Sequence, residues 1–235
     1  MGIVAGVDGR RGGWALVLVD VGSGLVVDVS VLPGQTPAGA RELLARCREA
    51  GAAAVGVDAP IGLPEHDWRP ADLLAKRRLG RGAARVFLTP PREVLGEPTY
   101  ALARARCRIA MRGKGLSAQS FGIRGLVLAL DAALAESAWA HSHVVEVHPE
   151  LSFMAMAARP PGDPMASKRT DLGASQRLAA LETWLRDVRS LNLPPGDDHL
   201  DALAAAWSAH RWQQGRAEVL GGELDATGQP MRIVV

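Results

Sequence analysis

Acidic residues close two apolar segments of this sequence. Asp8 ends "GIVAGVD" and Asp58 lies near the end of "AAVGVDAP", and residues that break a strand pattern follow each of them. Glu146 lies among valines in "VVEVHPE", while Asp198 and Asp201 are three residues apart in "DDHLDALAAAW". An ionised carboxylate in apolar surroundings is costly unless it meets a cation or several hydrogen-bond donors. We therefore expect these acids to meet a shared partner.

Convergence of these carboxylates would favour a divalent cation. Like charges held close together raise one another's pKa values unless a cation neutralises them. Hard oxygen ligands select Mg²⁺ or Mn²⁺, and two such ions could stabilise the attacking and leaving oxygens of a phosphodiester displacement. The predicted metal ligands are Asp8, Asp58, Glu146, Asp198 and Asp201. The predicted catalytic residues are Asp8, Asp58, Glu146 and Asp201.

Each acid taken alone also has an ordinary structural explanation. An aspartate after a strand is usually a turn former, and Asp197 or Asp198 would serve as the N-cap of the last long helix. Asp201 fits this explanation less well, because it lies inside that helix among apolar residues. The coincidence of four such acids is what favours a site.

Other polar residues are suited to binding a substrate phosphate. In "MRGKGLSAQSFGI" two glycines flank a lysine, and a serine and a glutamine follow; an exposed helix-helix turn is an equally good explanation. A histidine in "EVHPE" could shuttle a proton or could be structural. The predicted substrate-binding residues are Arg10, Arg92, Lys114, Ser117, Gln119 and His148.

The elements around the first acids predict a sheet that brings them together. Residues 2–8, 14–21 and 24–32 are typical of three strands joined by glycine-rich turns, and 37–50 of a helix that leads into a strand within 53–60. A return through a helix makes this last strand a parallel neighbour of the first. Asp8 and Asp58 would then lie at the same carboxyl edge, where open α/β sheets bind ligands.

The rest of the chain is predicted to contain a helical insertion and a helical C-terminal part within a single domain, residues 1–235. Residues 59–142 form the insertion before the next strand, "SHVVEVHPE". The expected helices cover about 69–79, 98–112, 120–138, 149–157 and 173–189, and a last one opens at Asp197 or Asp198 and closes at Gly215. A hairpin is expected about 225–228.

Charge is distributed unevenly along the chain. The net charge is +2, but residues 69–114 hold 12 Lys or Arg against three acids, a local charge of +9. This asymmetry favours a polyanionic partner, nucleic acid or a nucleotide, although such residues often only solvate a surface. The sequence predicts no membrane segment and a cytoplasmic location, and its two distant cysteines are expected to be reduced thiols.

Six sequence blocks together resemble a known family. The blocks "GVDGRRGGW", "VDAPIGLP", "VFLTPPREVL", "GKGLSAQSFGI", "EVHPELSF" and "DDHLDALAAAW" occur in this order between residues 3 and 213. They resemble the domain-of-unknown-function family 429, described as predicted RNase H-like nucleases. The resemblance departs from the expected pattern at "KRTDLGA", residues 168–174, where a second lysine would be expected.

The resemblance implies a fold and a site. The fold would be α/β and RNase H-like, a mixed five-stranded sheet in the order β-β-β-α-β, then β, then α, with helices on both faces. Asp8, Asp58, Glu146 and Asp201 look like the acidic set of such a site. Asp198 resembles the additional acid of resolvase-type members of that superfamily.

We therefore predict a nuclease that depends on Mg²⁺ or Mn²⁺ and hydrolyses phosphodiester bonds. One alternative is a non-catalytic nucleotide or nucleic-acid binding module of RNase H-like fold. A second is an actin-like ATPase or phosphotransferase, whose first strand also ends in an aspartate before a glycine-rich hairpin. That class needs two copies of the fold, and this sequence shows only one.

Overall fold

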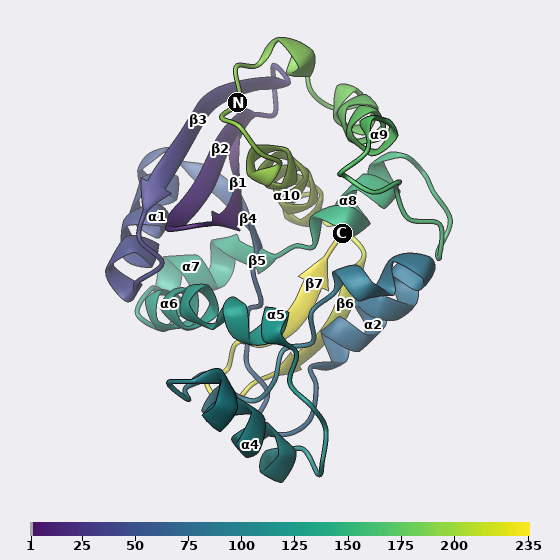
Figure 1. The fold of residues 1–235 in the computed structure, drawn as a ribbon. Helices are drawn as coiled ribbons and strands as arrows, with labels where there is room; N and C mark the ends of the chain where they lie inside the picture. Colours follow the sequence, from purple (N-terminus) through teal and green to yellow (C-terminus); the bar gives the residue numbers. More distant parts are fainter. Residues whose placement is uncertain (1) are drawn as a thin grey trace.

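A mixed five-stranded sheet forms the centre of the protein (Figure 1). The structure is a computed structural model and describes residues 2–235. The strand order is β3-β2-β1-β4-β5, with antiparallel pairing from β3 to β1 and parallel pairing from β1 to β5. The strands are β1 (Ile3–Arg10), β2 (Gly13–Asp20), β3 (Leu25–Pro33), β4 (Ala52–Asp58) and β5 (Val144–Glu146). This is the α/β, RNase H-like arrangement that the sequence predicts.

One turn and one capped helix set the register of the two acid-bearing strands. Gly12, with φ of 81°, forms the β1–β2 turn, where a left-handed conformation suits the twist of the hairpin. The side chain of Thr36 caps α1 (Pro37–Glu49), which returns the chain to the sheet. Because the return is parallel, Asp8 and Asp58 lie side by side in register at the carboxyl edge.

Helices cover both faces of the sheet, as predicted. α1 and α6 (Arg124–Ala135) pack against one face, and α10 (Asp198–Gln213) packs against the other. Gly6 and Gly56 let α10 approach closely: a Cβ at Gly6 would lie 1.8 Å from the carbonyl oxygen of Ala202, and one at Gly56 would also meet the α10 backbone, at 2.2 Å. This packing brings the first turn of α10 to the carboxyl edge of β1 and β4.

The segment between β4 and β5 is the predicted helical insertion, 59–142. Its elements are α2 (Pro70–Leu79), the 3-10 helix η1 (Gly80–Arg85), α3 (Arg92–Leu95), α4 (Tyr100–Ala110), α5 (Ala118–Gly122), α6 and α7 (Ala138–His143). α2 and α4 match the helices expected at 69–79 and 98–112. The helix expected at 120–138 is divided into α5 and α6, because the backbone leaves the helical conformation at Ile123, with φ of −89° and ψ of 0°.

The C-terminal part differs from the prediction mainly in element lengths. It comprises α8 (Pro149–Met156), α9 (Asp171–Glu182), the 3-10 helix η2 (Val188–Ser190), α10, β6 (Val219–Leu224) and β7 (Pro230–Val234). α9 ends earlier than expected because Thr183 bonds back to its last turn and Asp187 adopts a left-handed φ of 53°. β5 is shorter than "SHVVEVHPE" because α7 continues to His143 and α8 begins at Pro149. The expected terminal hairpin is present as β6 and β7.

The cysteines and the helices carry two further findings. Cys47 and Cys107 are buried and free, as expected of reduced thiols. Burial raises the pKa of Cys47 to about 12, so this thiol stays protonated at neutral pH. Among the helices of residues 2–235, none has both the length and the apolar composition needed to cross a membrane.

Candidate active site

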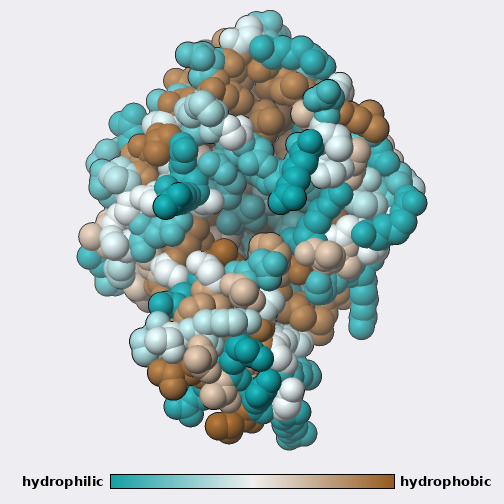
Figure 2. All heavy atoms as spheres, in the orientation of Figure 1, coloured by the Kyte–Doolittle hydropathy of each residue, from teal (hydrophilic) through white to brown (hydrophobic). Residues whose placement is uncertain are grey.

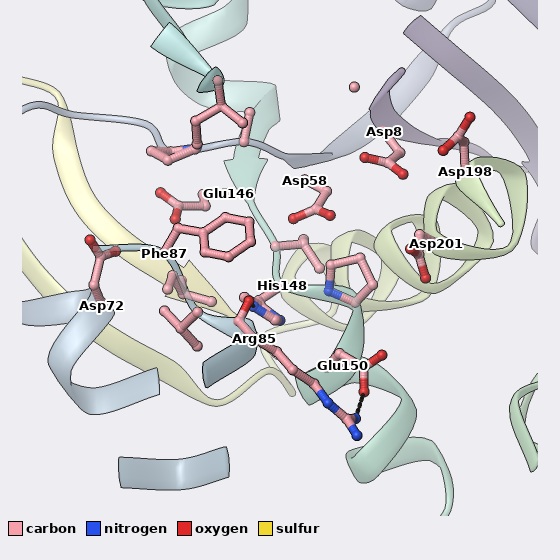
Figure 3. Close-up of a pocket in the computed structure, with 18 of the residues that line it drawn as sticks. Asp8, Asp58, Asp72, Arg85, Phe87, Glu146, His148, Glu150, Asp198 and Asp201 are labelled. Carbon is pink, nitrogen blue, oxygen red and sulfur yellow. Dashed lines mark hydrogen bonds and ion pairs between the residues drawn. The ribbon is translucent and has the colours of Figure 1, made fainter. Parts of the chain in front are cut away.

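A pocket of about 570 Å³ opens at the carboxyl edge of β1 and β4. Figure 2 shows it as a hydrophilic hollow near the middle of the face in view. Strand ends and α10 supply its acids, while the insertion contributes wall residues that include Ala59, Arg85, Phe87 and Leu126. In Figure 3, Asp8 and Asp58 point into this pocket from the strands, and Asp201 approaches them from α10.

Asp8 and Asp58 are carboxylates without a hydrogen-bond donor. They end neighbouring parallel strands in register, and Asp8 is only 8% exposed. Within residues 2–235 no side chain or backbone N–H donates a hydrogen bond to either carboxylate. Burial raises both pKa values well above the ordinary range, and the negative charges of neighbouring acids, Asp201 among them, raise them further. Two acids in this state lack the cation that would favour their charged forms.

The acids of α10 form ion pairs with cations of the chain. Asp201 accepts a hydrogen bond from Lys168 Nζ at 3.0 Å through Oδ2, while its Oδ1 is buried without a partner among the described residues. Burial raises the pKa of Asp201 to about 6, even though the charge of Lys168 opposes this shift. Lys168 also lies 2.5 Å from Asp197, and Arg10 Nε lies 3.5 Å from Asp198.

Glu146 differs from the other predicted ligands because it has a buried cationic partner. Both of its oxygens lie 2.7 Å from Arg69 Nη2, and one accepts the N–H of Ile61 at 2.7 Å. Arg69 is fully buried and also pairs with Asp72 at 3.2 Å. Burial raises the pKa of Glu146 to about 7, and Arg69 opposes that shift. Glu146 lines the pocket, but its charge is already used in an internal ion pair.

A second set of polar residues lines the pocket beside α8. Glu150 forms ion pairs with Arg85 and Arg177. The Nε2 of His148 lies 3.3 Å from the carbonyl oxygen of Arg85, and its Nδ1 is buried without a partner in the described chain. Burial lowers the pKa of His148, so its imidazole is neutral at neutral pH. The structure thus brings His148 to the acidic pocket, as the sequence analysis anticipated.

Of the remaining predicted substrate-binding residues, the structure brings Arg10 to the acids but not Arg92, Lys114, Ser117 or Gln119. Arg92 forms ion pairs with Asp131 and, at 3.2 Å, with Asp225. Lys114 pairs with Asp67 on the surface. Ser117 caps α5, and together with Gln119 it lines a separate pocket of about 230 Å³. Arg10 is at the edge of the acidic pocket, where it holds Asp198 rather than facing open space.

Two residues at this site, Lys168 and Arg69, were not among the predicted site residues. Lys168 lies in a polar, proline-rich loop, 33 residues before the aspartate that it contacts. Arg69 is 77 residues from Glu146 in the sequence, and nothing distinguishes it from the other cations of residues 69–114. Neither pairing follows a periodicity or a motif, so only the folded chain reveals it.

The donor set fits a divalent cation in its chemistry, although the side chains are not arranged around one. No group of three or more His, Cys, Asp or Glu side chains in residues 2–235 is positioned to hold a metal ion. Lys168 and Arg10 hold the α10 acids, and Arg69 holds Glu146. The buried, unpartnered Oδ1 of Asp201 and the donor-free Asp8 and Asp58 are nonetheless oxygen ligands in need of a cation.

Fold and site together define an RNase H-like α/β protein with an acidic pocket at the carboxyl edge of its sheet. The family model described as "Protein of unknown function (DUF429)" matches residues 6–226. The chain belongs to this family. A search of curated proteins finds no match.

Two solved structures are similar to this chain. The first is RuvC of T. thermophilus in complex with a Holliday junction substrate, which is 17% identical with a TM-score of 0.45; the alignment covers 92% of this chain and 98% of that one. The second is a Thermus thermophilus RuvC structure, 18% identical with a TM-score of 0.45, covering 91% and 97%. At these values the likeness assigns no activity to this chain.

Proposed function

We propose that this protein is a nuclease that depends on Mg²⁺ or Mn²⁺ and hydrolyses phosphodiester bonds in the acidic pocket. Asp8, Asp58 and Asp201 would hold the cation, and Asp198 would join them once released from Arg10. A bound divalent cation would supply an activated water and stabilise charge that develops on the phosphate. The protein's own contribution is to fix the acids at one edge of a rigid sheet.

The observation that carries this proposal is the pair of donor-free acids at the ends of β1 and β4. The two carboxylates lie in register, and the charge of Asp58 raises the pKa of Asp8, while Asp201 raises the pKa of both. A pair needed only for folding would be expected to meet an arginine or backbone donors, as Glu146 does. Asp8 and Asp58 therefore keep their charge available for an external cation.

Cations at the rim of the same pocket support a phosphate-bearing substrate. Lys168, Arg169 and Arg85 line it together with the acids. A substrate phosphate would contact these cations, while the bound metal ion would neutralise the acids of the pocket. The phosphate and the acids would then each face an opposite charge. We place this activity in the cytoplasm, because both cysteines are free and reduced thiols persist there.

A specific observation favours the second candidate, a non-catalytic module that binds a nucleotide or nucleic acid. Glu146 is committed to Arg69, so fewer acids are free to hold ions than the full predicted set of five. In such a module the acids would bind a cation that bridges to a ligand phosphate without turnover. The actin-like alternative is not supported by the fold, because residues 2–235 contain one sheet of this kind.

The experiment compares Mn²⁺ binding and cleavage in the wild type, Asp8→Asn and Asp20→Asn. Asp20 is a matched control, since it also ends a strand but lies outside the pocket lining. Isothermal titration with Mn²⁺ should give a site that Asp8→Asn removes and Asp20→Asn retains. Cleavage of labelled DNA and RNA should fall on the order of 1000-fold in Asp8→Asn, because the lost ligand costs several kcal/mol of transition-state stabilisation.

The outcomes separate the two candidates. A wild type that binds no Mn²⁺ at millimolar concentration would contradict both of them. Binding that Asp8→Asn removes, without cleavage of single-stranded, duplex, hybrid or branched substrates, would replace the nuclease with the binding module. Cleavage that survives Asp8→Asn would move the activity out of this pocket.

A further inference from the structure

More than half of the cations in residues 69–114 are paired with carboxylates, some inside the fold and some on its surface. Seven of its 12 cations form ion pairs with carboxylates, namely Arg69, Arg78, Arg81, Arg85, Arg92, Arg106 and Lys114. Five have no carboxylate partner among the described residues, namely Lys76, Arg77, Arg104, Arg108 and Arg112. Three of these five come from one helix and the turn that follows it, so the uncompensated charge is local.

That helix is α4, which projects from the body of the molecule at the end opposite α10 and β3 (Figure 1). Arg104 and Arg108 are four residues apart and so share one flank, and Arg112 lies in the turn beyond the helix, with a left-handed φ of 51°. All three are exposed. Arg104 stacks over the ring of Tyr100, 5.6 Å from its centroid, which orients the guanidinium without neutralising it.

The opposite flank of α4 is different, because its arginine is already paired. Arg106 lies 3.2 Å from Glu97 and 3.8 Å from Glu93. Between the flanks the crest of the helix is apolar, with Leu102 50% exposed and Ile109 77% exposed. A helix that only needed solubility would gain from charge on this crest, so its outer face is suited to contact rather than to water alone.

The segment that follows α4 lines a small pocket that adjoins the acidic pocket. After Arg112 the chain reaches Ser117 and Gln119, which line the pocket of about 230 Å³. That pocket and the acidic pocket share Ala84, Val86 and the exposed Phe87 as wall residues. A chain bound along α4 can therefore reach the acids without crossing the molecule.

We propose that α4 binds the sugar-phosphate backbone of a nucleic acid through Arg104, Arg108 and Arg112 and directs it toward the acidic pocket. From Arg104 to Arg108 the helix rises about 6 Å, and Arg112 lies two residues past its end. Phosphates of one strand recur about every 3.4 Å along a duplex axis, so the two helical arginines span about two of them. The inference rests on the proposed function in one respect, namely that the pocket processes phosphodiesters.

Nucleic acid fits these observations better than an acidic protein. Arg104 and Arg108 lie on one flank of α4 and Arg112 lies just beyond its end, and guanidinium groups bind phosphate oxygens in a bidentate way. Exposed apolar residues beside such a row can contact sugars and bases. Because the two pockets share wall residues, a long polymer could contact α4 and the acidic pocket at the same time.

The experiment measures binding in EDTA, where no cleavage occurs, with a fluorescein-labelled 30-nucleotide DNA strand and the corresponding duplex. The test variant is Arg104→Ala/Arg108→Ala/Arg112→Ala. The control, Arg41→Ala/Arg46→Ala/Arg48→Ala, removes the same charge from the exposed face of α1, where Arg41 pairs with Glu136 and Arg46 with Asp28. Thermal unfolding of both variants should match the wild type, because alanine favours helices.

The α4 variant should bind on the order of 100-fold more weakly at 0.1 M salt. The slope of log K against log salt should fall by about 2 for the single strand and about 3 for the duplex. The α1 variant should keep the wild-type slope. An equal loss in both variants would reduce the effect to overall charge and overturn the proposal, as would an unchanged slope in the α4 variant or a wild type that binds neither DNA.

Two further measurements separate this inference from the proposed function. Mn²⁺ titration of the α4 variant should give the wild-type affinity, since the arginines lie outside the acidic pocket. If Mn²⁺ binds and a small phosphodiester, bis(p-nitrophenyl) phosphate, is hydrolysed while α4 has no role in DNA binding, the pocket stands and the α4 proposal fails. Binding of polyglutamate that depends on the three arginines more strongly than DNA binding does would also overturn it in favour of an acidic protein.

Discussion

Glu146 and the pair Asp8 and Asp58 lie at the same edge of the sheet, but they differ in their hydrogen-bond and ion-pair partners. Glu146 has Arg69 and a backbone N–H as partners, each at 2.7 Å. Asp8 and Asp58 have each other as neighbours and no donor among the described residues. Glu146, Asp8 and Asp58 all face the pocket in Figure 3, but only Asp8 and Asp58 lack a hydrogen-bond donor among the described residues.

The difference teaches which buried acids to associate with chemistry. A buried ion pair is complete in itself, and losing one partner strands the other in a medium of low polarity. A buried like-charged pair is incomplete and makes the folded state less stable until a cation arrives. The two groups should therefore respond to neutral substitution with opposite changes in stability.

Glu146→Gln should have the largest effect on stability. The substitution leaves Arg69 buried with only Asp72, so we expect the free energy of unfolding to fall by about 3 kcal/mol or more. Urea unfolding measures this change. Glu136→Gln is the control, because its pair with Arg41 is exposed on both sides and should cost less than about 1 kcal/mol. A small loss of stability together with lost Mn²⁺ binding would instead make Glu146 a ligand.

Asp58→Asn should change stability in the opposite direction. Because the folded-state pKa of Asp58 lies above its ordinary value of 3.8, the folded state retains this proton and loses stability as pH rises through that window. In EDTA at pH 8 the variant should be on the order of 1 to 3 kcal/mol more stable than the wild type. The difference should disappear below about pH 3, where Asp58 is protonated in both the folded and the unfolded state.

Mn²⁺ sharpens the same test. One millimolar Mn²⁺ should raise the unfolding temperature of the wild type and leave that of Asp58→Asn nearly unchanged, because ligand binding stabilises only the form that binds it. Asp20→Asn should show neither effect, since hydrogen bonds from Gly22 and Ser23 lower the pKa of Asp20. An Asp58→Asn variant that is less stable than the wild type at pH 8 would show that the acid pair has a hidden partner.

Lys168→Met should have the smallest effect, on affinity. Its ammonium lies 3.0 Å from Asp201 and competes with an external cation, while methionine keeps the apolar stem. Mn²⁺ should bind about fivefold more tightly, close to 1 kcal/mol for a half-exposed pair. Arg169→Met is the control, because this neighbour forms no ion pair in the described part of the chain. Weaker Mn²⁺ binding in Lys168→Met would show that the lysine is needed to hold Asp201 in place.

The sequence was informative about backbone and much less so about side-chain partners. The strand meander, the parallel return and the register of Asp8 beside Asp58 all follow from turn residues and alternation, which are local signals. Element ends were less predictable. α9 ends early because of a side-chain bond from Thr183, and β5 is short because Pro149 starts a helix.

Long-range pairings explain what sequence reasoning missed at the site. Glu146 was predicted as a ligand because it is acidic and flanked by valines, but Arg69 reaches it from another element. Arg92 was predicted to bind substrate and instead holds Asp131 and Asp225. Which cation meets which carboxylate is decided by packing between elements, and a single sequence carries no periodic trace of that choice.

Because α10 lies so close to the sheet, a substitution at the centre of the sheet would change the position of the pocket acids. A single methyl group at Gly6 would collide with the carbonyl of Ala202, the residue next to Asp201. Relief of that collision has to displace the helix, and the acid moves with it. The distance between the pocket acids therefore depends on glycine at position 6, in the middle of β1. A substitution at Gly6 would disable the site although no residue of the pocket had changed.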